Sequence, residues 1–526
     1  MFVLVSFFVL FLFNEAHTIG PVVRSPLGVI EGIRYKDVNV FLGLRYAKAE
    51  RFMPPEMVNC WNQTYKATSY GTSCRAYASF MPMIDPMSDD CLFMNIIAPN
   101  HTNPKSEGYP VLVFIHGGGF EFGSANHYNY KIIAENFVSK DIVFVGFNYR
   151  IGPFGFFSTG DKFSPGNNGL WDQSVALRFV KRVIASFGGN PNKITVMGQS
   201  AGNLFHQTIM MSGSLFGPPL YSNRVVDQSM HLATAVGCDV TIASSEIMDC
   251  VKSTNISTFN DVLQTLTPIT DELMGIRFHP RLDNHFLPSD LKHLLLFSPS
   301  KPTIIGMSDM EAGPFTMADD YSMLVAIHES ERESFDRPKL EALLRILAGD
   351  SERFFDLLKD FYINRPWTAS NGSNPEYVFY LTQLTHLASD LMFNIPVIQE
   401  ARERSEVGWP VYQYLLTNIA SEHEGLPVKG TFHNTDLRYL FKKVAESEFQ
   451  HSLIEGFVSF VKNGKPTVNG RNWLPITRKL PGRHFVFGSK NELRNEQFMA
   501  ETIDFWLKKV PQNVKRQEFT YSMPLV

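Results

Sequence analysis

The stretch KITVMGQSAG (residues 193–202) most constrains the fold of this chain, because an apolar strand runs directly into a serine between two glycines. Residues 193–198 are mostly apolar and β-branched, which is typical of a buried strand. Gly198 and Gly202 flank Ser200 at the positions where a sharp turn from strand to helix leaves no room for side chains. The spacing therefore predicts a nucleophile elbow that exposes the hydroxyl of Ser200 at the carboxyl end of a strand.

Further apolar runs alternate with amphipathic stretches along the chain. Strands are predicted at residues 109–119, 141–150, 302–308, 410–416 and 484–488. Residues 170–189 have apolar side chains at helical spacing and end at a pair of glycines, a helix stop signal. Apolar strands that alternate with helices favour an α/β fold with a mostly parallel sheet covered on both faces. Since no Pro/Gly/Ser-rich linker divides the chain, we predict a single domain over residues 17–526.

The N-terminal stretch MFVLVSFFVLFLF differs from the rest of the chain in being apolar throughout. A run of about a dozen apolar residues is short for a membrane span and suits the core of a signal peptide. We predict a signal peptide over residues 1–16, with cleavage near Ala16, and therefore a secreted protein. No later run is long enough for a membrane-spanning helix, so no transmembrane anchor is predicted.

Cysteine usage and glycosylation sequons agree with export. The five cysteines are Cys60, Cys74, Cys91, Cys238 and Cys250, and none has the CxxC spacing of a zinc or redox site. Short-range pairs of Cys74 with Cys91 and of Cys238 with Cys250 would close small loops and leave Cys60 over. Sequons of the form N-x-S/T begin at Asn62, Asn100, Asn255 and Asn371.

The composition excludes some classes of partner. Hydrophobic residues make up 44% of the chain and charged residues 19%, as is ordinary for a globular protein with a substantial core. The formal net charge is -4, without the basic surplus that nucleic-acid binding or a polybasic membrane surface requires. We therefore expect a small-molecule partner and no nucleic acid, and the sequence does not indicate the oligomeric state.

A nucleophilic serine needs a base, and the base needs an acid that orients it. Downstream of Ser200, His423 and His433 both lie in loops that could present a base. Asp309 and Glu311 follow the predicted strand 302–308 and could each supply the acid. Spacing alone does not choose between these two carboxylates.

The sequence HGGG (residues 116–119) ends another predicted strand and could stabilise an oxyanion. Consecutive glycines there leave the backbone N–H groups of Gly118 and Gly119 free to point at a developing negative charge. The N–H of Ala201, directly after the nucleophile, would be the third donor. We interpret His116 as a structural residue.

With these motifs in place, the chain resembles the type-B carboxylesterases, the α/β-hydrolase family that includes the cholinesterases. The resemblance covers essentially everything after the signal peptide. The motifs that carry it occur in the family's order: FLGLRYA, SDDCLFMNI, VFIHGGGF, NYRIGPFGF, GNNGLWDQSVAL, FGGNPNKITVMGQSAG, GMSDMEAGPF and GTFHNTDLRYLF.

The resemblance implies an α/β-hydrolase fold and a serine esterase mechanism. The family's catalytic triad matches Ser200, Glu311 and His433, with Gly118, Gly119 and Ala201 as the oxyanion hole. Its disulfides match Cys74–Cys91 and Cys238–Cys250. The implied reaction is two-step acyl transfer on a carboxylic ester, and it requires no metal or cofactor.

Three features point away from acetylcholine as the ester. The loop between the first two paired cysteines, residues 75–90, contains no Trp, where the resemblance places the choline-binding Trp of cholinesterases. Aliphatic Met274 and Ile276 stand where cholinesterases carry aromatic residues of the acyl pocket. The residue before the nucleophile is Gln199 where the family usually has Glu, so a negative charge that favours cationic substrates is absent.

The chain is shorter than the family directly after the elbow. Residues 203–207 (NLFHQ) stand where the family has a full helix before the strand that TIMMSGS resembles. Parallel neighbouring strands normally need a crossover of about a dozen residues or more. We therefore expect the crossover helix to be missing and part of the sheet to lose its cover. One interpretation is an incomplete gene model. The other is a catalytically impaired family member that serves as a binding or adhesion ectodomain.

Overall fold

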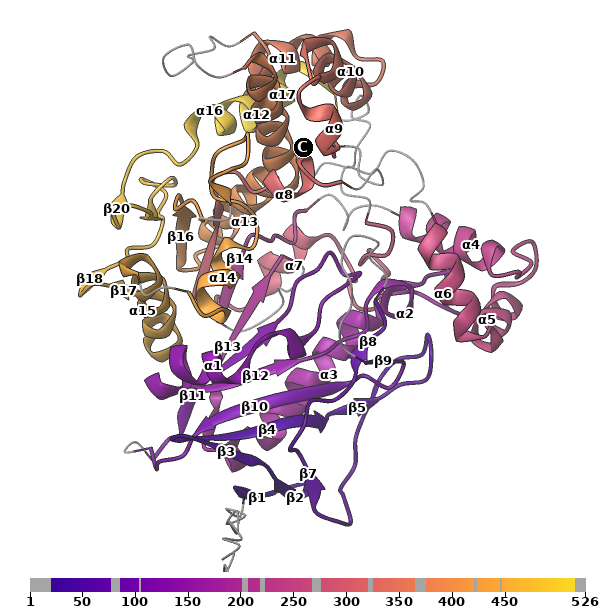
Figure 1. Cartoon of the computed structure of the whole chain (residues 1–526), viewed down its shortest axis with the longest axis vertical. Coiled ribbons are helices and arrows are strands. Elements are labelled where there is room, and N and C mark those ends of the chain that lie inside the picture. Colours follow the sequence, from indigo (N-terminus) through magenta and orange to yellow (C-terminus); the bar gives the residue numbers. More distant parts are fainter. Residues whose placement is uncertain are drawn as a thin grey trace, which may run out of the picture.

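The structure is a computed structural model (Figure 1). It describes residues 20–76, 86–103, 106–200, 207–217, 223–266, 276–319, 325–364, 375–420, 423–444 and 447–515. The predicted signal peptide, Ala201, Met274 and the sequon at Asn371 lie outside the described residues. No helix in the part of the chain that the structure describes is long and apolar enough to cross a membrane.

A twisted sheet, 11-stranded within the described residues, runs through the molecule (Figure 1). Its order from edge to edge is β20 (Glu492–Arg494), β19 (His484–Phe487), β16 (Val411–Leu416), β15 (Thr303–Ser308), β14 (Thr208–Met211), β13 (Gly189–Gln199), β11 (Tyr109–Ile115), β12 (Val143–Phe147), β10 (Phe93–Pro99), β4 (Val38–Arg45) and β3 (Ile33–Tyr35). The strands from β19 to β12 are parallel, and antiparallel pairs form both edges. The predicted α/β class is confirmed.

Each strand predicted from an apolar run is present, and the ends differ by a few residues. The predicted helix over 170–189 is α3 (Asn168–Val183), followed by a 3₁₀ turn over Ile184–Phe187. Gly188 ends this turn with φ of 81°, a left-handed conformation that glycine adopts without steric cost. The stop signal in the sequence therefore acts at the first glycine of the pair.

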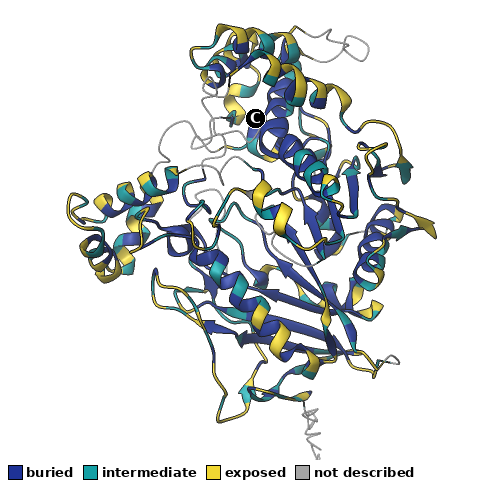
Figure 2. Cartoon of the chain, turned by 180° about the vertical axis from the view of Figure 1, so that it is seen from behind, coloured by how far each residue is buried: buried dark blue, intermediate teal, exposed yellow. Residues whose placement is uncertain are grey.

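Alternate side chains of the buried strands pack against helices on opposite faces of the sheet. On β11, Leu112 and Phe114 join the cluster that contains Phe457 of α15 (Glu448–Asn463). Val111 and Val113 of the same strand join the cluster of α3. This period of two places both faces of the strand in apolar surroundings, as expected for a sheet with helices on both sides. Figure 2 shows the central strands buried throughout, whereas the outer helices are partly exposed.

Two groups of helices lie beyond the sheet (Figure 1). One contains α4 (Arg224–Ala235), α5 (Ser244–Ser253) and α6 (Ile256–Thr265), and it includes the disulfide Cys238–Cys250. The other contains α10 (Arg337–Ala348), α11 (Glu352–Tyr362) and α12 (Glu376–Ser389) around a buried core of its own. The second predicted disulfide, Cys74–Cys91, is also formed, and Cys60 is free and exposed.

β14 lies in the sheet although residues 200–207 alone connect it to β13. It pairs in parallel with both β13 and β15. Ile209 and Met211 are buried on one face of the sheet. On the other face, Met210 is fully buried in a cluster with Val397 of α13 (Ile395–Glu406). The predicted loss of cover is therefore not seen at Met210, because this side chain is buried in a cluster that includes side chains of α13.

Candidate active site

Ser200 directly follows β13 and has φ of 55°, which is rare for a residue with a side chain. Such backbone strain is typical of a serine held at a sharp turn between a strand and the next element. The N–H of Ser200 donates to the carbonyl of Met211 at 2.8 Å, so the turn is attached to the end of β14. The side chain of Ser200 is half-buried. These features agree with the predicted elbow.

Gly213, which is not among the residues predicted from the sequence, makes the close approach of this turn possible. A Cβ atom on Gly213 would lie 2.0 Å from the carbonyl oxygen of Ser200, which is a severe clash. The preceding residue, Ser212, is fully buried and also has a positive φ, 49°. The sequence signal was the SGS that follows the strand TIMM, whose glycine stands at a position that admits no side chain.

Glu311 and His433 form a buried hydrogen-bonded pair. Nδ1 of His433 lies 2.7 Å from Oε2 of Glu311, and the N–H of His433 donates to the carbonyl of Glu311 at 3.1 Å. The other carboxylate oxygen of Glu311 accepts from the hydroxyl of Ser212 and from the N–H of Ser308, each at 2.6 Å. Because Glu311 is fully buried, these donors compensate for the loss of hydration of its charge.

The structure separates the alternatives that spacing left open. Asp309 accepts from the N–H of Thr431 at 2.6 Å, so it holds the loop that leads to His433. Burial raises the pKa of Asp309 to about 6. The ring of His423 packs on Phe432 with centroids 4.6 Å apart. The acid that contacts a candidate base is thus Glu311, and its partner is His433.

The second ring nitrogen of His433 contacts Gln199. Within the described residues, the hydrogen bond at Nε2 comes from the side-chain amide of Gln199 at 2.9 Å and not from Ser200. Since an amide N–H can only donate, we assign Nε2 as an acceptor and Nδ1 as protonated and donating to Glu311. This tautomer is the one that a general base for Ser200 requires, but Gln199 must leave Nε2 before His433 can accept a proton there.

Three consecutive glycines line the other side of the site. Gly117 has no room for a side chain, because its Cβ would lie 2.8 Å from the backbone carbonyl oxygen of Gln199. Gly118 and Gly119 have φ of 122° and 57°, which glycine adopts readily. Within the described residues neither N–H is used in a backbone hydrogen bond, so both remain free to donate. The third predicted donor, Ala201, lies outside the described residues.

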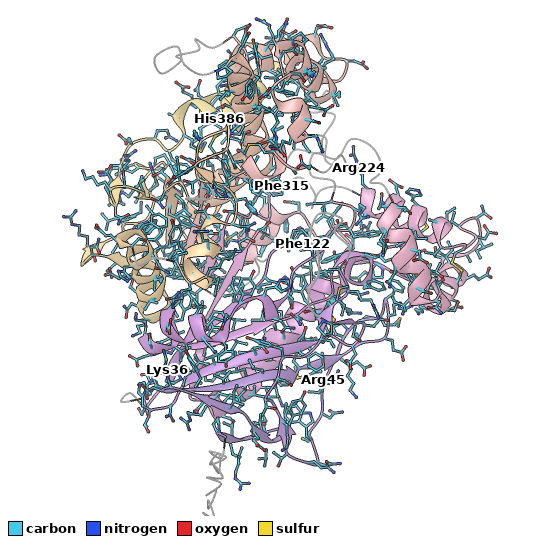
Figure 3. All side chains as sticks on the ribbon, in the orientation of Figure 1. Lys36, Arg45, Phe122, Arg224, Phe315 and His386 are labelled. Atoms are coloured by element: carbon cyan, nitrogen blue, oxygen red, sulfur yellow. A yellow bond between two sulfur atoms is a disulfide. The ribbon has the colours of Figure 1, made fainter. Side chains whose placement is uncertain are left out.

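Aromatic side chains pack on His433, and an aliphatic side chain lies next to Gly119. Phe315 of α8 (Gly313–Thr316), labelled in Figure 3, packs on the ring of His433 with centroids 5.5 Å apart. Phe393, in a π-helical turn over Asp390–Asn394, packs on the same ring with centroids 4.6 Å apart. The side chain of Ile276 lies 3.5 Å from the position of a Cβ on Gly119. Ile276 is predicted from the sequence, and Phe315 ends the motif GMSDMEAGPF, which is one of those that carry the family resemblance. Nothing in the sequence pattern indicated Phe393.

A second buried carboxyl, Asp436, lies in α14 (Thr435–Phe441), close behind His433 in the sequence. It accepts a hydrogen bond from the hydroxyl of Tyr414 at 3.3 Å. Burial, with a smaller contribution from the charge of Glu311, raises the pKa of Asp436 to about 6. Asp436 is thus a buried carboxyl close enough to Glu311 for the charge of Glu311 to disfavour its ionisation.

We expect Asp436→Asn to stabilise the protein above about pH 7 and to leave stability near pH 4 unchanged. A carboxyl whose native pKa lies above its unfolded pKa binds more protons in the native state, so native stability falls as pH rises from about 4 to 6. Removing the carboxyl should raise the free energy of unfolding by about 1–3 kcal/mol at neutral pH. Urea unfolding at both pH values measures this, and an equal gain at both would contradict it.

The mostly parallel sheet flanked by helices, with a strained serine at the end of a central strand, is the arrangement of an α/β-hydrolase. Residues 20–506 match the carboxylesterase family. The chain is 30% identical over 532 residues to gut esterase 1 of Caenorhabditis briggsae, which covers 93% of this chain and 92% of that protein. It is 32% identical over 505 residues to gut esterase 1 of Caenorhabditis elegans, with 87% of each chain covered. Over 528 residues it is 29% identical to human cocaine esterase, with 91% and 89% covered.

The chain belongs to the carboxylesterase family. This membership makes it a carboxylic-ester hydrolase by class, and the resemblance noted in the sequence is confirmed.

Proposed function

We propose that this protein is a secreted serine esterase that cleaves small carboxylic esters through an acyl-enzyme intermediate. Ser200 is the nucleophile, His433 is the general base, and Glu311 orients His433. The observation that carries the proposal is the buried hydrogen bond of 2.7 Å between Nδ1 of His433 and Oε2 of Glu311. A carboxylate in this position fixes the tautomer of the imidazole and stabilises the imidazolium that forms during proton transfer.

The reaction proceeds in two steps. Nε2 of His433 accepts the hydroxyl proton as Oγ of Ser200 attacks the ester carbonyl, and the imidazolium then protonates the leaving alkoxide. Water, deprotonated by His433, next attacks the acyl-enzyme, and the acid product leaves with the regeneration of Ser200. The free N–H groups of Gly118 and Gly119, together with that of Ala201, stabilise the oxyanion in both steps.

The substrate class follows from the walls of the site. Ile276 borders Gly119, so an acyl group bound at the oxyanion hole meets an aliphatic side chain. Gln199 contributes no charge next to the imidazole. Both features favour a neutral carboxylic ester over a quaternary ammonium ester such as acetylcholine.

We expect Gln199→Glu to shift selectivity towards a cationic substrate. A carboxylate at this buried position attracts a positive charge in the site, and about 1.4 kcal/mol of added attraction corresponds to a tenfold change. The ratio of kcat/KM for acetylthiocholine to that for neutral S-phenyl thioacetate should therefore rise about tenfold. The neutral thioester serves as the internal control. An unchanged ratio would show that Gln199 does not set the charge preference.

Export remains part of the proposal. Disulfides persist in oxidising compartments, and Cys74–Cys91 and Cys238–Cys250 are compatible with secretion. The sequons at Asn62, Asn100 and Asn255 lie on exposed residues, as glycosylation requires. We propose that these asparagines, and Asn371, carry glycans.

The direct test is covalent labelling of the purified full-length protein with a fluorescent organophosphate. We expect an adduct on Ser200, located by peptide mass spectrometry, and hydrolysis of p-nitrophenyl butyrate faster than that of acetylthiocholine. An adduct at a different serine would disprove the assignment of the nucleophile. The reverse order of rates would disprove the proposed substrate class.

A second candidate function is binding without catalysis, as in an adhesion ectodomain. Two observations favour it: Gln199 occupies Nε2 of His433, and residues 200–207 leave no length for a crossover helix behind Ser200. A folded, secreted protein that gives neither an adduct nor hydrolysis would support this function over the esterase. The transcript sequence across residues 202–204 would then show whether the shortened segment is genuine.

A further inference from the structure

A buried ion pair lies next to the glycines of the proposed oxyanion hole. Glu121 is in the loop that follows β11, and Arg277 is adjacent to Ile276. Nε of Arg277 lies 3.4 Å from Oε1 of Glu121, and the two side chains are only 11% and 12% exposed. Burial raises the pKa of Glu121, and the charge of Arg277 opposes this shift. Because both charges are removed from water, loss of either one would leave the other buried without a compensating charge.

The hydrogen bonds of the pair connect it to three segments of backbone. Oε1 of Glu121 also accepts from the N–H groups of Arg277 and Phe278, at 2.9 and 3.0 Å. Nη1 of Arg277 donates to the carbonyls of Leu263 and Leu266, at 3.2 and 3.0 Å. These carbonyls lie at the C-terminal end of α6. The pair therefore connects the loop after β11, the segment 276–278 and helix α6.

Both residues of the pair are also close in the chain to residues of the proposed oxyanion hole and its surroundings. The N–H of Glu121 donates to the carbonyl of Gly118 at 2.9 Å, which closes the turn that contains Gly119. On the other side of the pair, Ile276 directly precedes Arg277 and borders Gly119. The ion pair thus lies between the turn that contains Gly119 and the segment that carries Ile276, and its side-chain bonds hold that segment. Figure 3 labels Phe122, the residue that follows Glu121 in this loop.

We infer that Glu121 and Arg277 are positioning residues that hold Ile276 against Gly119 and thereby limit the length of the acyl group. This inference rests on the proposed function. The two hydrogen bonds from the N–H groups of Arg277 and Phe278 to Glu121 hold the segment that carries Ile276. When this segment is held in place, the side chain of Ile276 cannot move aside, so longer acyl chains overlap with it and are rejected. Without the pair, segment 276–278 is free to move away from Gly119, and longer chains become acceptable.

The test measures kcat and KM for p-nitrophenyl acetate, butyrate and decanoate. In Glu121→Ala and Arg277→Met, we expect the ratio of kcat/KM for decanoate to that for butyrate to rise about tenfold, mainly through a lower KM for decanoate. Arg277→Lys keeps the positive charge but lacks the several N–H donors of the guanidinium. The ratio in this variant should therefore lie between that of the wild type and that of Arg277→Met. The double variant Glu121→Gln/Arg277→Gln leaves no unpaired charge and should fold even where a single variant does not.

The matched control is Arg404→Met, which breaks another buried ion pair, with Glu400 in α13. It should lower thermal stability without changing the ratio. The inference would be overturned if the Glu121 and Arg277 variants lost kcat/KM equally on all three esters and kept the wild-type ratio. The pair would then have a structural role only.

A second readout is independent of catalysis. We expect hydrogen exchange at the amides of Arg277 and Phe278 to be at least about tenfold faster in Glu121→Ala than in the wild type, because their acceptor is lost. If the wild type hydrolyses no ester, the proposed function fails, whereas faster exchange would still support the positioning role. Unchanged exchange would overturn that role whether or not the enzyme is active.

Discussion

Ser200→Ala is expected to abolish hydrolysis of p-nitrophenyl butyrate, with kcat falling by about 10⁶-fold, because the acyl-enzyme can no longer form. The loss should be in kcat rather than in KM, since Ser200 Oγ bonds to the substrate only when the reaction begins. Steady-state kinetics with enough enzyme to detect the residual rate measures this effect. The organophosphate adduct should disappear together with the activity.

Ser214→Ala is the matched control for this loss. Ser214 lies in the same SGS stretch, but its hydroxyl donates to Oε2 of Glu400 at 2.7 Å and also lies 2.9 Å from the carbonyl oxygen of Pro396. The variant should lose some stability and keep kcat within about threefold of the wild type. If Ser200→Ala retained more than a small fraction of the wild-type rate, another residue would be the nucleophile.

Glu311→Gln is expected to lower kcat by about 10⁴-fold without unfolding the protein. A neutral amide of the same shape at Oε2 can donate to Nδ1, which favours the tautomer with the proton on Nε2, where it cannot accept from Ser200. The fully buried charge that stabilises the imidazolium is lost as well. The variant should still bind a substrate analogue, so the decrease should appear in kcat more than in KM.

Asp309→Asn is the control that shows whether the fall in kcat of Glu311→Gln is specific to Glu311 or follows from the loss of any nearby negative charge. Asp309 lies two residues before Glu311, is half-buried and accepts from the N–H of Thr431. The amide oxygen of asparagine can accept the same hydrogen bond, so kcat should change by less than about tenfold. Similar losses in Asp309→Asn and Glu311→Gln would show that Glu311 has no special role.

Much of the fold could be predicted from the sequence, because the buried strands are apolar runs bounded by glycines and polar residues. Residues 109–115 and 143–147 are examples, and each lies inside a longer predicted strand. The strand before Ser200 was recognised for the same reason. Local composition is sufficient in these cases, since a strand buried on both faces needs apolar side chains at nearly every position.

Less of the candidate site could be predicted from local sequence patterns. Spacing could not distinguish Glu311 from Asp309, because both follow the same strand. The difference lies in which side chain faces His433, 122 residues away in the chain. The family resemblance supplied that choice. The contact between Gln199 and Nε2 of His433 was not predicted, because it depends on the rotamer of a side chain next to Ser200.

Phe393 and the Glu121–Arg277 pair were also missed, for a related reason. Phe393 reaches His433 from a π-helical turn, a local widening of the helix that the sequence does not mark. Glu121 and Arg277 are separated by 156 residues, and nothing in the sequence around them indicates that both charges are buried. Partners of this kind are determined by tertiary contacts and not by periodicity.

The short connection between β13 and β14 has a consequence for the order of folding. The entropy lost on closing a loop grows with its length, by about 0.6 kcal/mol for each doubling. Parallel strands usually close long loops and pair late, whereas Val196 of β13 pairs with Thr208 of β14, only 12 residues further on. We therefore expect this pair to form early, from nearly local contacts. His433 reaches Gln199 across 234 residues. The turn that contains Ser200 would thus exist before the base arrives, and the completed site would mark the end of folding.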